Sequence, residues 1–553
     1  MSNNTNKYII LAEAFLEHFK YHLIYIDSEK LYYIYDTEKG NWHSKEQLEI
    51  ESEVLKYLRV QPHLLKKAGT ISSSLIKQVV YMVKLISNKP TWPITSPGLV
   101  LVENGIINLD DPQKLLEKGP NYWIRNILPY KVDPLTKIKR SDFPAIHNWL
   151  TEVTNGNEPF YKLLVYYLQA VIIGRTDLQK YLEIVGPGGT GKSTFINLAI
   201  NLVGIINTAV TELKQLEGNR FETAQLRNKK LIVITDASKY TGEAATLKAI
   251  IGQDSLRIEE KGKPISAPIT IKGMVIIASN EELKPAEPSS AIYRRRISVQ
   301  FSSIPTVKRE LLVQGINGPK GEFVPELGYF FQYLLQLDHK EGQDFICNYE
   351  TNVPSLSEIR LNNIKNTNNI AGFALNVLQN VPILYGARLY LGYRGSLSIY
   401  QLYCENCKQI NSQPFALNRF GALFNDIITN VLKWQTVGKQ PSRNSYGNFY
   451  SNIAFVYLNQ YIIFNKTNPT VFFIYLLTDD PLRSSGGTQP YGLLVFVSTT
   501  KAQLILANSV TPIYIDNFNL TQLSDHLHEN AKISDARLTF SELTERFSKP
   551  MKD

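Results

Sequence analysis

A glycine-rich segment in the middle of the chain has the residue types and the spacing that hold a triphosphate. It fits the pattern G-x-x-x-x-G-K-[ST] at every required position. Its residues are Gly186, Pro187, Gly188, Gly189, Thr190, Gly191, Lys192 and Ser193, followed by Thr194. Glycines let consecutive N–H groups curl around phosphate oxygens, the lysine would place a cation on the β- and γ-phosphates, and the serine hydroxyl would ligate Mg²⁺. The segment predicts a site for ATP or a similar nucleotide with Mg²⁺; a glycine-rich turn without nucleotide is the alternative.

A phosphate-binding loop of this kind also needs an acid on a neighbouring strand to hold the water shell of the metal. The apolar strand predicted at 231–234 continues through Thr235 to Asp236, which is therefore a candidate Mg²⁺ ligand and catalytic acid; a turn or a helix cap is the alternative. The next position, where a water-orienting glutamate is common, is Ala237. Three other acids could orient the water, and the sequence does not choose among them: Glu222, Glu243 and Asp254.

Two further candidates for catalysis belong to a third apolar strand, predicted at 274–278, and to the residues after it. The run ends in Asn280, whose amide could bond the γ-phosphate or the attacking water; a strand-terminal turn is the alternative. Arg294, Arg295 and Arg296 come next, and guanidinium groups present bidentate forks to a phosphate in transfer. A solvated basic run is the alternative, but the short distance after Asn280 favours a catalytic role.

The segments around these residues predict the elements that position them. Tyr181 to Val185 reads as a strand before the glycine-rich segment, and Thr194 to Val203 reads as a helix after it, stopped by Gly204. Helical patterns at 144–153 and 160–173 precede this unit, and the apolar strands after it alternate with further helical patterns up to about residue 301. Apolar strands alternating with helices indicate an α/β fold, with a parallel sheet covered on both faces.

Composition sets wider limits. The 553 residues exceed one hydrophobic core, and the net charge of +9 is a mild excess that a phosphate-backbone partner would suit. Three cysteines exclude a disulfide framework and fit a reducing compartment. The longest apolar stretches, 163–173 and 471–477, are too short to span a bilayer. We therefore expect a soluble intracellular protein without a membrane partner, in the cytoplasm or in an organelle such as a plastid.

Residues 181–301 resemble the superfamily 3 helicase domain of phage and plasmid primase-helicases, a group similar to the poxvirus primase-helicase. The matching elements stand in family order, and they are 186–194, Arg220-Phe221-Glu222, 229–236, Lys248 with Gly252 and Asp254, Asn280, and 291–296 with Phe301. The resemblance implies an AAA+-like P-loop ATPase that forms a homo-hexameric ring and translocates on single-stranded or forked DNA. Asp236 falls where the family usually carries a glutamate, Asn280 matches the sensor position, and Arg295, then Arg294, best matches the arginine finger.

The resemblance also gives a meaning to a predicted β-hairpin. Residues 255–260 and 265–272 alternate like strands around a turn that carries Lys261 and Lys263. In the related helicases such a hairpin projects into the channel of the ring and grips the DNA backbone. Lys261, Lys263 and the neighbouring Arg257 are the expected DNA contacts, with a solvated hairpin tip as the alternative.

The flanking regions resemble the family less closely. Residues 1–140 look like its α+β N-terminal domain, with Val102 to Ile106 the clearest piece, and 141–310 are the ATPase domain. Residues 311–369 are expected to be a helical connection that ends in a polar linker at 364–370. A winged-helix-like domain is expected at 370–450, and 451–553 are unassigned. No primase catalytic centre is evident, so priming would need a separate primase partner.

Within the winged-helix-like region, Tyr403 to Phe424 carries the resemblance, and a helix is predicted at 418–430 with a basic turn that contains Lys439 and Arg443. Cys404 and Cys407 are spaced like zinc ligands, but a tetrahedral site needs four, so we interpret both as packing residues.

The sequence thus favours an ATP-dependent helicase that serves the replication of a mobile, viral, plasmid or organellar element. Two alternatives stay open. One is a P-loop ATPase that remodels DNA or protein without unwinding. The other, suggested by Asp236-Ala237, is a degenerate initiator that binds nucleotide and DNA.

Overall fold

The computed structural model describes two compact units, the first made of residues 1–287 and 295–361 and the second of 288–294 and 362–553. Within them, the described residues are 7–64, 70–93, 98–235, 237, 240, 242–260, 267–284, 290–305, 309–315, 318–380, 389–392, 398–434, 442–444, 447–450, 453–455, 477–478, 489–490, 492–498, 501–506 and 513–516. Among these residues, no helix combines the length and the apolar character needed to cross a membrane.

The first unit begins with helices and two small sheets. The helices are α1 (Lys7–His18), α2 (Gln47–Arg59) and α4 (Ser73–Ile86). One sheet has the order β3-β2-β1-β4, from β1 (Leu23–Ile26), β2 (Leu31–Tyr35), β3 (Trp42–Lys45) and β4 (Asn88–Lys89). The other has the order β7-β6-β5-β8, from β5 (Leu99–Val102), β6 (Gly105–Asn108), β7 (Asp111–Leu116) and β8 (Ile127–Leu128). Residues of one face of the first sheet share a core with the three helices.

A five-stranded parallel sheet forms the centre of the first unit. Its strands are β9 (Tyr181–Val185), β10 (Thr208–Glu212), β11 (Leu231–Thr235), β14 (Met274–Ser279) and β15 (Arg296–Gln300). They lie in the order β10-β11-β14-β9-β15. Strand β9 therefore lies between two strands that follow it in the chain, β14 and β15.

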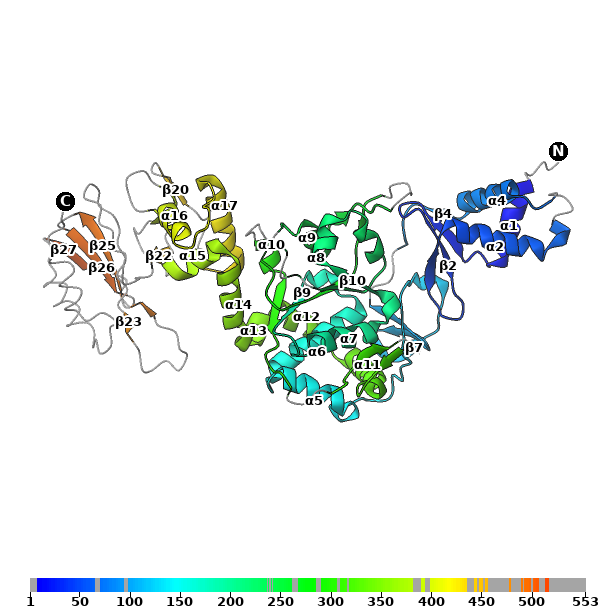
Figure 1. The fold of residues 1–553 in the computed structure, drawn as a ribbon, viewed down its shortest axis with the longest axis horizontal. Helices are drawn as coiled ribbons and strands as arrows, with labels where there is room; N and C mark the ends of the chain where they lie inside the picture. Colours follow the sequence, from blue (N-terminus) through cyan, green and yellow to red (C-terminus); the bar gives the residue numbers. More distant parts are fainter. Residues whose placement is uncertain are drawn as a thin grey trace. The chain divides into compact units, whose positions relative to one another are not determined.

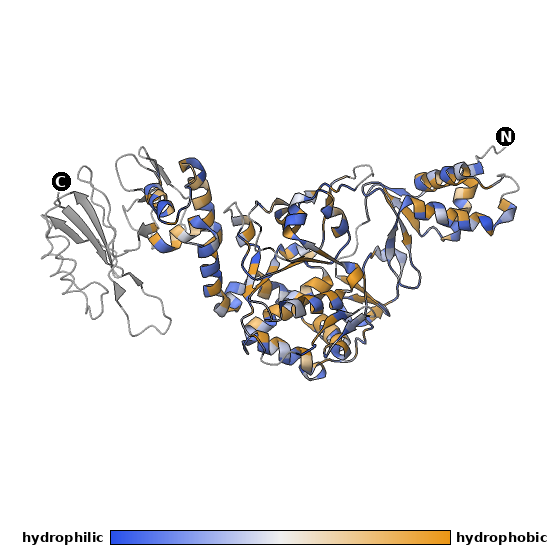
Figure 2. Cartoon of the chain, viewed as in Figure 1, coloured by the Kyte–Doolittle hydropathy of each residue, from blue (hydrophilic) through white to orange (hydrophobic). Residues whose placement is uncertain are grey.

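Alternating side chains of these strands enter different layers. Leu182 and Ile184 of β9 pack into the large core that also contains residues of α6 (Glu158–Ile173) and α7 (Lys192–Val203). Helices α5 (Pro144–Val153), α11 (Leu327–Gln336), α12 (His339–Cys347) and α13 (Tyr349–Asn352) contribute to the same core, while α8 (Leu213–Gly218) and α9 (Ala245–Gly252) lie on the other side of the sheet in Figure 1. Apolar residues are concentrated on the central strands and on the helices around them (Figure 2). The predicted parallel sheet with helices on both faces is confirmed.

Helix α14 (Pro354–Thr367) corrects one expectation. The polar stretch 364–370 was expected to be a linker, but α14 runs to Thr367 and α15 (Asn369–Val377) starts after a single residue. That residue, Asn368, accepts hydrogen bonds from the backbone N–H groups of Ile370 and Ala371, at 3.0 Å each. Asparagine is a strong N-cap residue, so the polar composition marks a helix boundary here.

The second unit combines short helices with small antiparallel sheets. Its helices are α10 (Ser290–Tyr293), α15, α16 (Ile399–Gln409) and α17 (Leu417–Asp426), and α17 continues into a π-helical turn at Ile427–Val431. Its sheets are β18 (Leu378–Asn380) with β22 (Ile453–Phe455), β19-β21-β20 from Leu389–Tyr390, Gly447–Tyr450 and Ser442–Asn444, β23 (Leu477–Thr478) with β24 (Gln489–Pro490), and β25-β26-β27 from Gly492–Ser498, Lys501–Leu506 and Ile513–Asp516. Cys407 is buried in the core of this unit, as expected of a packing residue. Lys439 lies outside the described residues, and the winged-helix assignment stays a prediction.

The buried hydroxyl of Tyr167 on α6 offers a test of this packing. It donates to the carbonyl oxygen of Val275 at 2.6 Å and accepts from the N–H of Leu182 at 3.1 Å. Tyr167→Phe should lower the free energy of unfolding of the first unit by about 1–3 kcal/mol, because buried backbone groups would lose a partner. Urea unfolding measures the change, with Tyr329→Phe, at a residue that is 52% exposed, as the control. Equal stability of the two variants would contradict the bridging role.

Candidate functional site

The glycine-rich segment forms the loop between β9 and α7, at the carboxyl end of the sheet. Gly189 and Gly191 have φ of +85° and +93°, in the left-handed region that other residues rarely adopt. At Gly186 a side chain would collide with the carbonyl oxygen of Phe301, so the backbone can pass there only without a Cβ. The expected strand is confirmed as β9, and the expected helix starts two residues early, at Lys192.

Lys192 connects this loop to the end of the neighbouring strand. Its Nζ donates to the carbonyl oxygens of Gly186 at 2.5 Å and Pro187 at 2.8 Å, and to Oδ1 of Asn280 at 3.1 Å. Asn280 directly follows β14, which pairs with β9 in parallel register. Partial burial lowers the pKa of the Lys192 ammonium below its usual value. Two residues that the sequence proposed separately, Lys192 and Asn280, are therefore in direct contact.

Ser193 and Thr190 hold different places in the loop. Ser193 is exposed in the first turn of α7, so its hydroxyl is accessible at the end of the helix where N–H groups are unpaired. Thr190 is buried, and its hydroxyl donates to the carbonyl oxygen of Pro187 at 2.9 Å, which closes the loop on itself. Thr194 is half-buried.

Asp236, the expected metal ligand, lies outside the described residues. The preceding residue, Thr235, ends β11, and it pairs with Ala278 of β14, which in turn pairs with Ile184 of β9. The carboxyl ends of β11, β14 and β9 therefore share one edge of the sheet.

The three alternative acids lie in different surroundings. Glu222 accepts hydrogen bonds from the hydroxyl of Thr211 and the amide of Gln225, next to the edge strand β10. Glu243 is exposed before α9. The carboxylate of Asp254 and the guanidinium of Arg295 both approach Gly252, where a Cβ would lie 3.0 Å from each.

The arginines lie where the parallel strands begin, at the amino edge of the sheet, opposite the carboxyl edge where the glycine-rich loop starts. Arg296 is the first residue of β15 and is in register with Tyr181, the first residue of β9. The carbonyl oxygen of Arg295 accepts from the N–H of Tyr181 at 2.9 Å. Arg294 is exposed and Arg295 half-buried. The two arginine-finger candidates thus start from the amino edge, whereas the glycine-rich loop leaves the carboxyl edge about 16 Å away along a five-residue strand.

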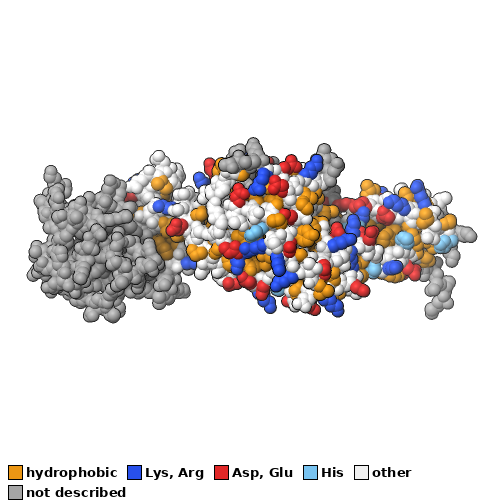
Figure 3. All heavy atoms as spheres, turned by 90° about the horizontal axis from the view of Figure 1, so that it is seen from below, with side chains coloured by type: hydrophobic (Ala, Val, Ile, Leu, Met, Phe, Trp, Pro, Cys, Tyr) orange, Lys and Arg blue, Asp and Glu red, His pale blue; other side chains and the backbone are white. Residues whose placement is uncertain are grey.

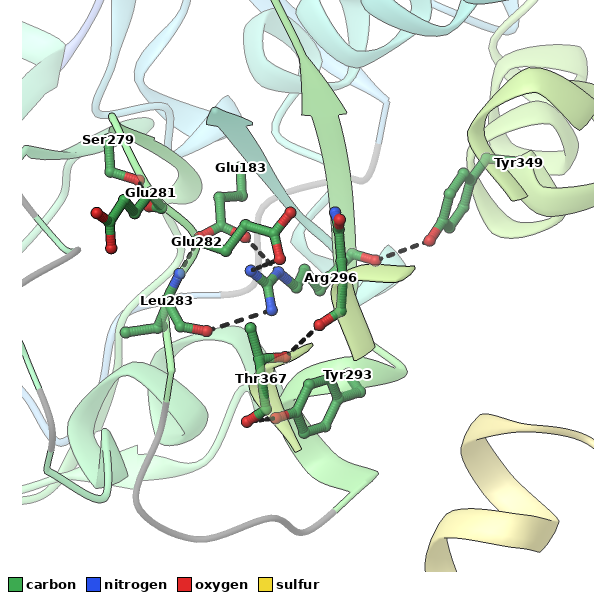
Figure 4. Close-up of polar contacts among 10 residues, drawn as sticks. Glu183, Ser279, Glu281, Glu282, Leu283, Tyr293, Arg296, Tyr349 and Thr367 are labelled. Atoms are coloured by element: carbon green, nitrogen blue, oxygen red, sulfur yellow. Dashed lines mark hydrogen bonds and ion pairs between the residues drawn. The ribbon is translucent and has the colours of Figure 1, made fainter. Parts of the chain in front are cut away.

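Arg296, the third arginine of the run, has a buried ion-pair partner in the sheet. Its side chain is 4% exposed and forms an ion pair with Glu183 of β9, whose side chain is fully buried. Arg296 Nη1 also donates to the carbonyl oxygen of Leu283 at 3.3 Å, and Glu183 Oε1 accepts from the N–H of Leu283 at 2.8 Å (Figure 4). Glu282 approaches Arg296 Nη2 at 3.8 Å.

The sequence contains a sign of this cluster outside any motif, namely a charged residue inside an apolar strand. Glu183 is the only charged residue in an apolar strand, Tyr181 to Val185, that the pattern predicts to be buried. A buried carboxylate needs a partner of opposite charge, because an isolated charge is costly to remove from water. Three arginines follow the apolar strand that ends before Asn280, so Glu183 could have been matched to one of them before the fold was known.

The predicted hairpin is confirmed in part. Strands β12 (Ser255–Leu256) and β13 (Ile269–Thr270) pair in antiparallel register, while Lys261 and Lys263 lie outside the described residues. Arg257 is exposed and lies 3.4 Å from Glu259. On the face drawn in Figure 3, Lys and Arg side chains are interspersed with Asp and Glu side chains, so that face presents mixed charge.

Comparisons with known proteins match two parts of the chain. Residues 12–155 match a family model described as "D5 N terminal like", and residues 184–296 match one described as "Family of unknown function (DUF5906)". The second range contains the glycine-rich loop, Asn280 and the three arginines. The first agrees with the resemblance of the N-terminal region to that of phage and plasmid primase-helicases.

Individual relatives are distant. The uncharacterized mitochondrial protein ymf20 of Marchantia polymorpha is 27% identical over 128 residues, which are 23% of this chain and 77% of that protein. The uncharacterized mitochondrial protein ymf21 of the same organism is 29% identical over 107 residues, 18% of this chain and 59% of that protein. Among solved structures, the A form apo structure of the NrS-1 C terminal region covers 66% of this chain and 79% of its own, with 15% identity and a TM-score of 0.40. The apo structure of NrS-1 residues 305–718 covers 81% and 99%, with 12% identity and a TM-score of 0.40.

The ionisation of Glu282 gives a prediction for stability. Burial, with the nearby charge of Glu183, raises the pKa of the Glu282 carboxyl to about 7 although Arg296 acts against the shift. The folded state then binds a proton that the unfolded chain releases between pH 4.5 and about 7, so this residue makes folding less favourable as pH rises through that window.

Glu282→Gln removes this pH-dependent cost. The difference in free energy of unfolding between the variant and the wild type should grow in favour of the variant as pH rises from 5 to 8. The growth should be roughly 1–2 kcal/mol after allowance for solvent screening. Unfolding curves at several pH values measure the gain, and Glu281→Gln, at the exposed neighbouring carboxylate, controls for the loss of one negative charge. A gain that is the same at pH 5 and pH 8 would exclude titration of Glu282 as its cause.

Proposed function

We propose that the protein is an ATP-dependent DNA helicase of the superfamily 3 type, acting in the replication of a mobile, viral, plasmid or organellar element. The observation that carries the proposal is the contact of Lys192 with Asn280 at the carboxyl edge of a parallel sheet, beside a loop whose first residue, Gly186, leaves no room for a Cβ. In open α/β sheets, ligands bind at this edge. The D5 N terminal like match and the sequence resemblance support the replication role.

The loop residues fit a triphosphate. Gly189 and Gly191, both in the left-handed region, leave the backbone of the loop open to a phosphate, and α7 begins directly after Gly191. Lys192 would exchange its bonds to loop carbonyls for phosphate oxygens, and Asn280 would orient the attacking water or the γ-phosphate. Bound Mg²⁺ would neutralise charge on the phosphates, and Ser193 and Asp236 are the residues proposed to hold it.

The arginines would complete the site of a neighbouring subunit. Arg295 leaves the sheet at the amino edge, and the loop of the same chain leaves it at the carboxyl edge. A guanidinium that stabilises a transferring phosphate must touch it, so Arg295, or Arg294 beside it, is proposed to act on nucleotide bound to the next subunit of a homo-hexameric ring. The hairpin with Arg257, Lys261 and Lys263 is proposed to grip single-stranded or forked DNA, and a separate primase is the proposed partner for priming.

DNA-stimulated ATP hydrolysis tests the proposal. The wild type should hydrolyse ATP faster with single-stranded DNA and should displace a strand from a forked duplex. Lys192→Ala should lose about 100-fold or more in turnover, because the cation on the β- and γ-phosphates is removed. ATP hydrolysis at the same rate with and without DNA would instead indicate an ATPase that remodels DNA or protein without unwinding. Nucleotide binding without turnover in the wild type would indicate an initiator that has lost hydrolysis.

Mixing two inactive variants tests the placement of the arginine. Arg295→Ala and Lys192→Ala should each abolish turnover alone, and Arg295→Ala should keep its affinity for ATP. In mixed rings, a site with intact Lys192 can adjoin a neighbour with intact Arg295, so mixing equal amounts should restore about a quarter of the wild-type turnover per subunit. The mixture needs time and DNA for subunit exchange, and wild type mixed with Lys192→Ala is the control. If the control mixture shows subunit exchange but the two inactive variants recover no turnover when mixed, Arg295 does not act between subunits.

A further inference from the structure

The connection from β14 to β15 joins the two edges of the central sheet. It starts with Asn280, beside Lys192, and ends with Arg295, directly before β15 begins at Arg296. In the described part of the connection, Leu283 lies over β9, which separates β14 from β15 in the sheet. Leu182 and Ile184 point into the core shared with α6 and α7, so Glu183 between them faces the opposite side of the sheet.

One residue of this crossover is held by both strands beneath it. Glu183 of β9 accepts the N–H of Leu283 at 2.8 Å, and Arg296 of β15 donates to the carbonyl oxygen of Leu283 at 3.3 Å (Figure 4). Glu183 and Arg296 also bond each other. The turn before Leu283 is closed by the hydroxyl of Ser279, which donates to the carbonyl oxygen of Glu281. Asn280 therefore lies in a short turn fixed at both ends.

A buried ion pair adds little to the free energy of unfolding, but it can fix the positions of the groups that it bonds. Removing two charges from water costs about as much as their attraction returns, and apolar residues of similar size often stabilise a core more. Here the two side chains, 0% and 4% exposed, also satisfy both backbone groups of Leu283. They fix the position of Leu283 over β9, and only Ile184 and Val185 separate Glu183 from the start of the glycine-rich loop at Gly186.

We propose that Glu183 and Arg296 are positioning residues that make Asn280 and Arg295 respond together to nucleotide at the glycine-rich loop. The proposal rests on the proposed function, because it needs nucleotide at that loop. When phosphate draws Lys192 away from Asn280, the turn changes its contacts, and Leu283 transmits the change to the ion pair. Arg295 directly precedes Arg296, so a shift of the ion pair would move Arg295, which is proposed to act on nucleotide bound to the next subunit.

Glu183→Gln tests the coupling, because glutamine can still accept from Leu283 but no longer carries the charge that holds Arg296. Turnover of ATP should fall about tenfold, while the dissociation constant of a non-hydrolysable ATP analogue stays within about twofold. The matched control is Glu29→Gln, which breaks another buried ion pair, Glu29 with Arg125 at 2.6 Å, away from the crossover. Equal losses of turnover in both variants would reduce the role of Glu183 to stability and overturn the proposal.

Hydrogen exchange measures the coupling without turnover. With the analogue and Mg²⁺, the wild type should become protected both at 186–193 and at 292–296, whereas Glu183→Gln should become protected only at 186–193. Protection of the loop without protection of 292–296 in the wild type overturns the coupling and leaves the proposed function standing. No protection of the loop in the wild type overturns the proposed function itself. Arg296→Lys should repeat the pattern of Glu183→Gln, and it decides the matter together with the wild type if Glu183→Gln does not fold.

Discussion

The insertion of β9 between β14 and β15 is the constraint on which the first unit depends. Parallel strands end at a common edge, so the glycine-rich loop after β9 and Asn280 after β14 must be neighbours. Because β15 runs parallel to β9, the chain must also return to the amino end of the strands before β15 can start. The arginines that precede β15 are therefore carried to the amino edge by topology, whatever their own chemistry favours.

The crossover explains why a charged residue is found inside an apolar strand. Backbone groups of a chain that crosses a sheet face have no ladder to join, and buried groups without a partner are costly. Glu183 and Arg296 supply the partner for both groups of Leu283, and each also neutralises the other. A hydrophobic pair would cover the same area and leave Leu283 unsatisfied, so at this point the polar solution is favoured by hydrogen bonding rather than by charge alone.

The sequence predicts features that depend on neighbouring residues better than features that depend on contacts between residues far apart in the chain. Strands β9, β11 and β14 and helices α5, α6 and α7 come from short apolar patterns, and the loop comes from eight consecutive residues, so all of them were predicted closely. The role of Arg296 was not, because it depends on Glu183, 113 residues away in the chain. The expected linker at 364–370 failed for a different reason: asparagines are common both in loops and at helix starts, and only the bonds of Asn368 separate the two.

The two edges of the sheet also bear on what one chain can do alone. At the carboxyl edge, the described side chains bring together one cation, Lys192, and one amide, Asn280. Transfer of a phosphoryl group spreads negative charge over oxygens that a single lysine does not surround, and the guanidinium groups of this chain start at the opposite edge. Under the proposed function, a second copy of the chain is therefore part of the active site, and assembly becomes a condition for chemistry rather than a consequence of it.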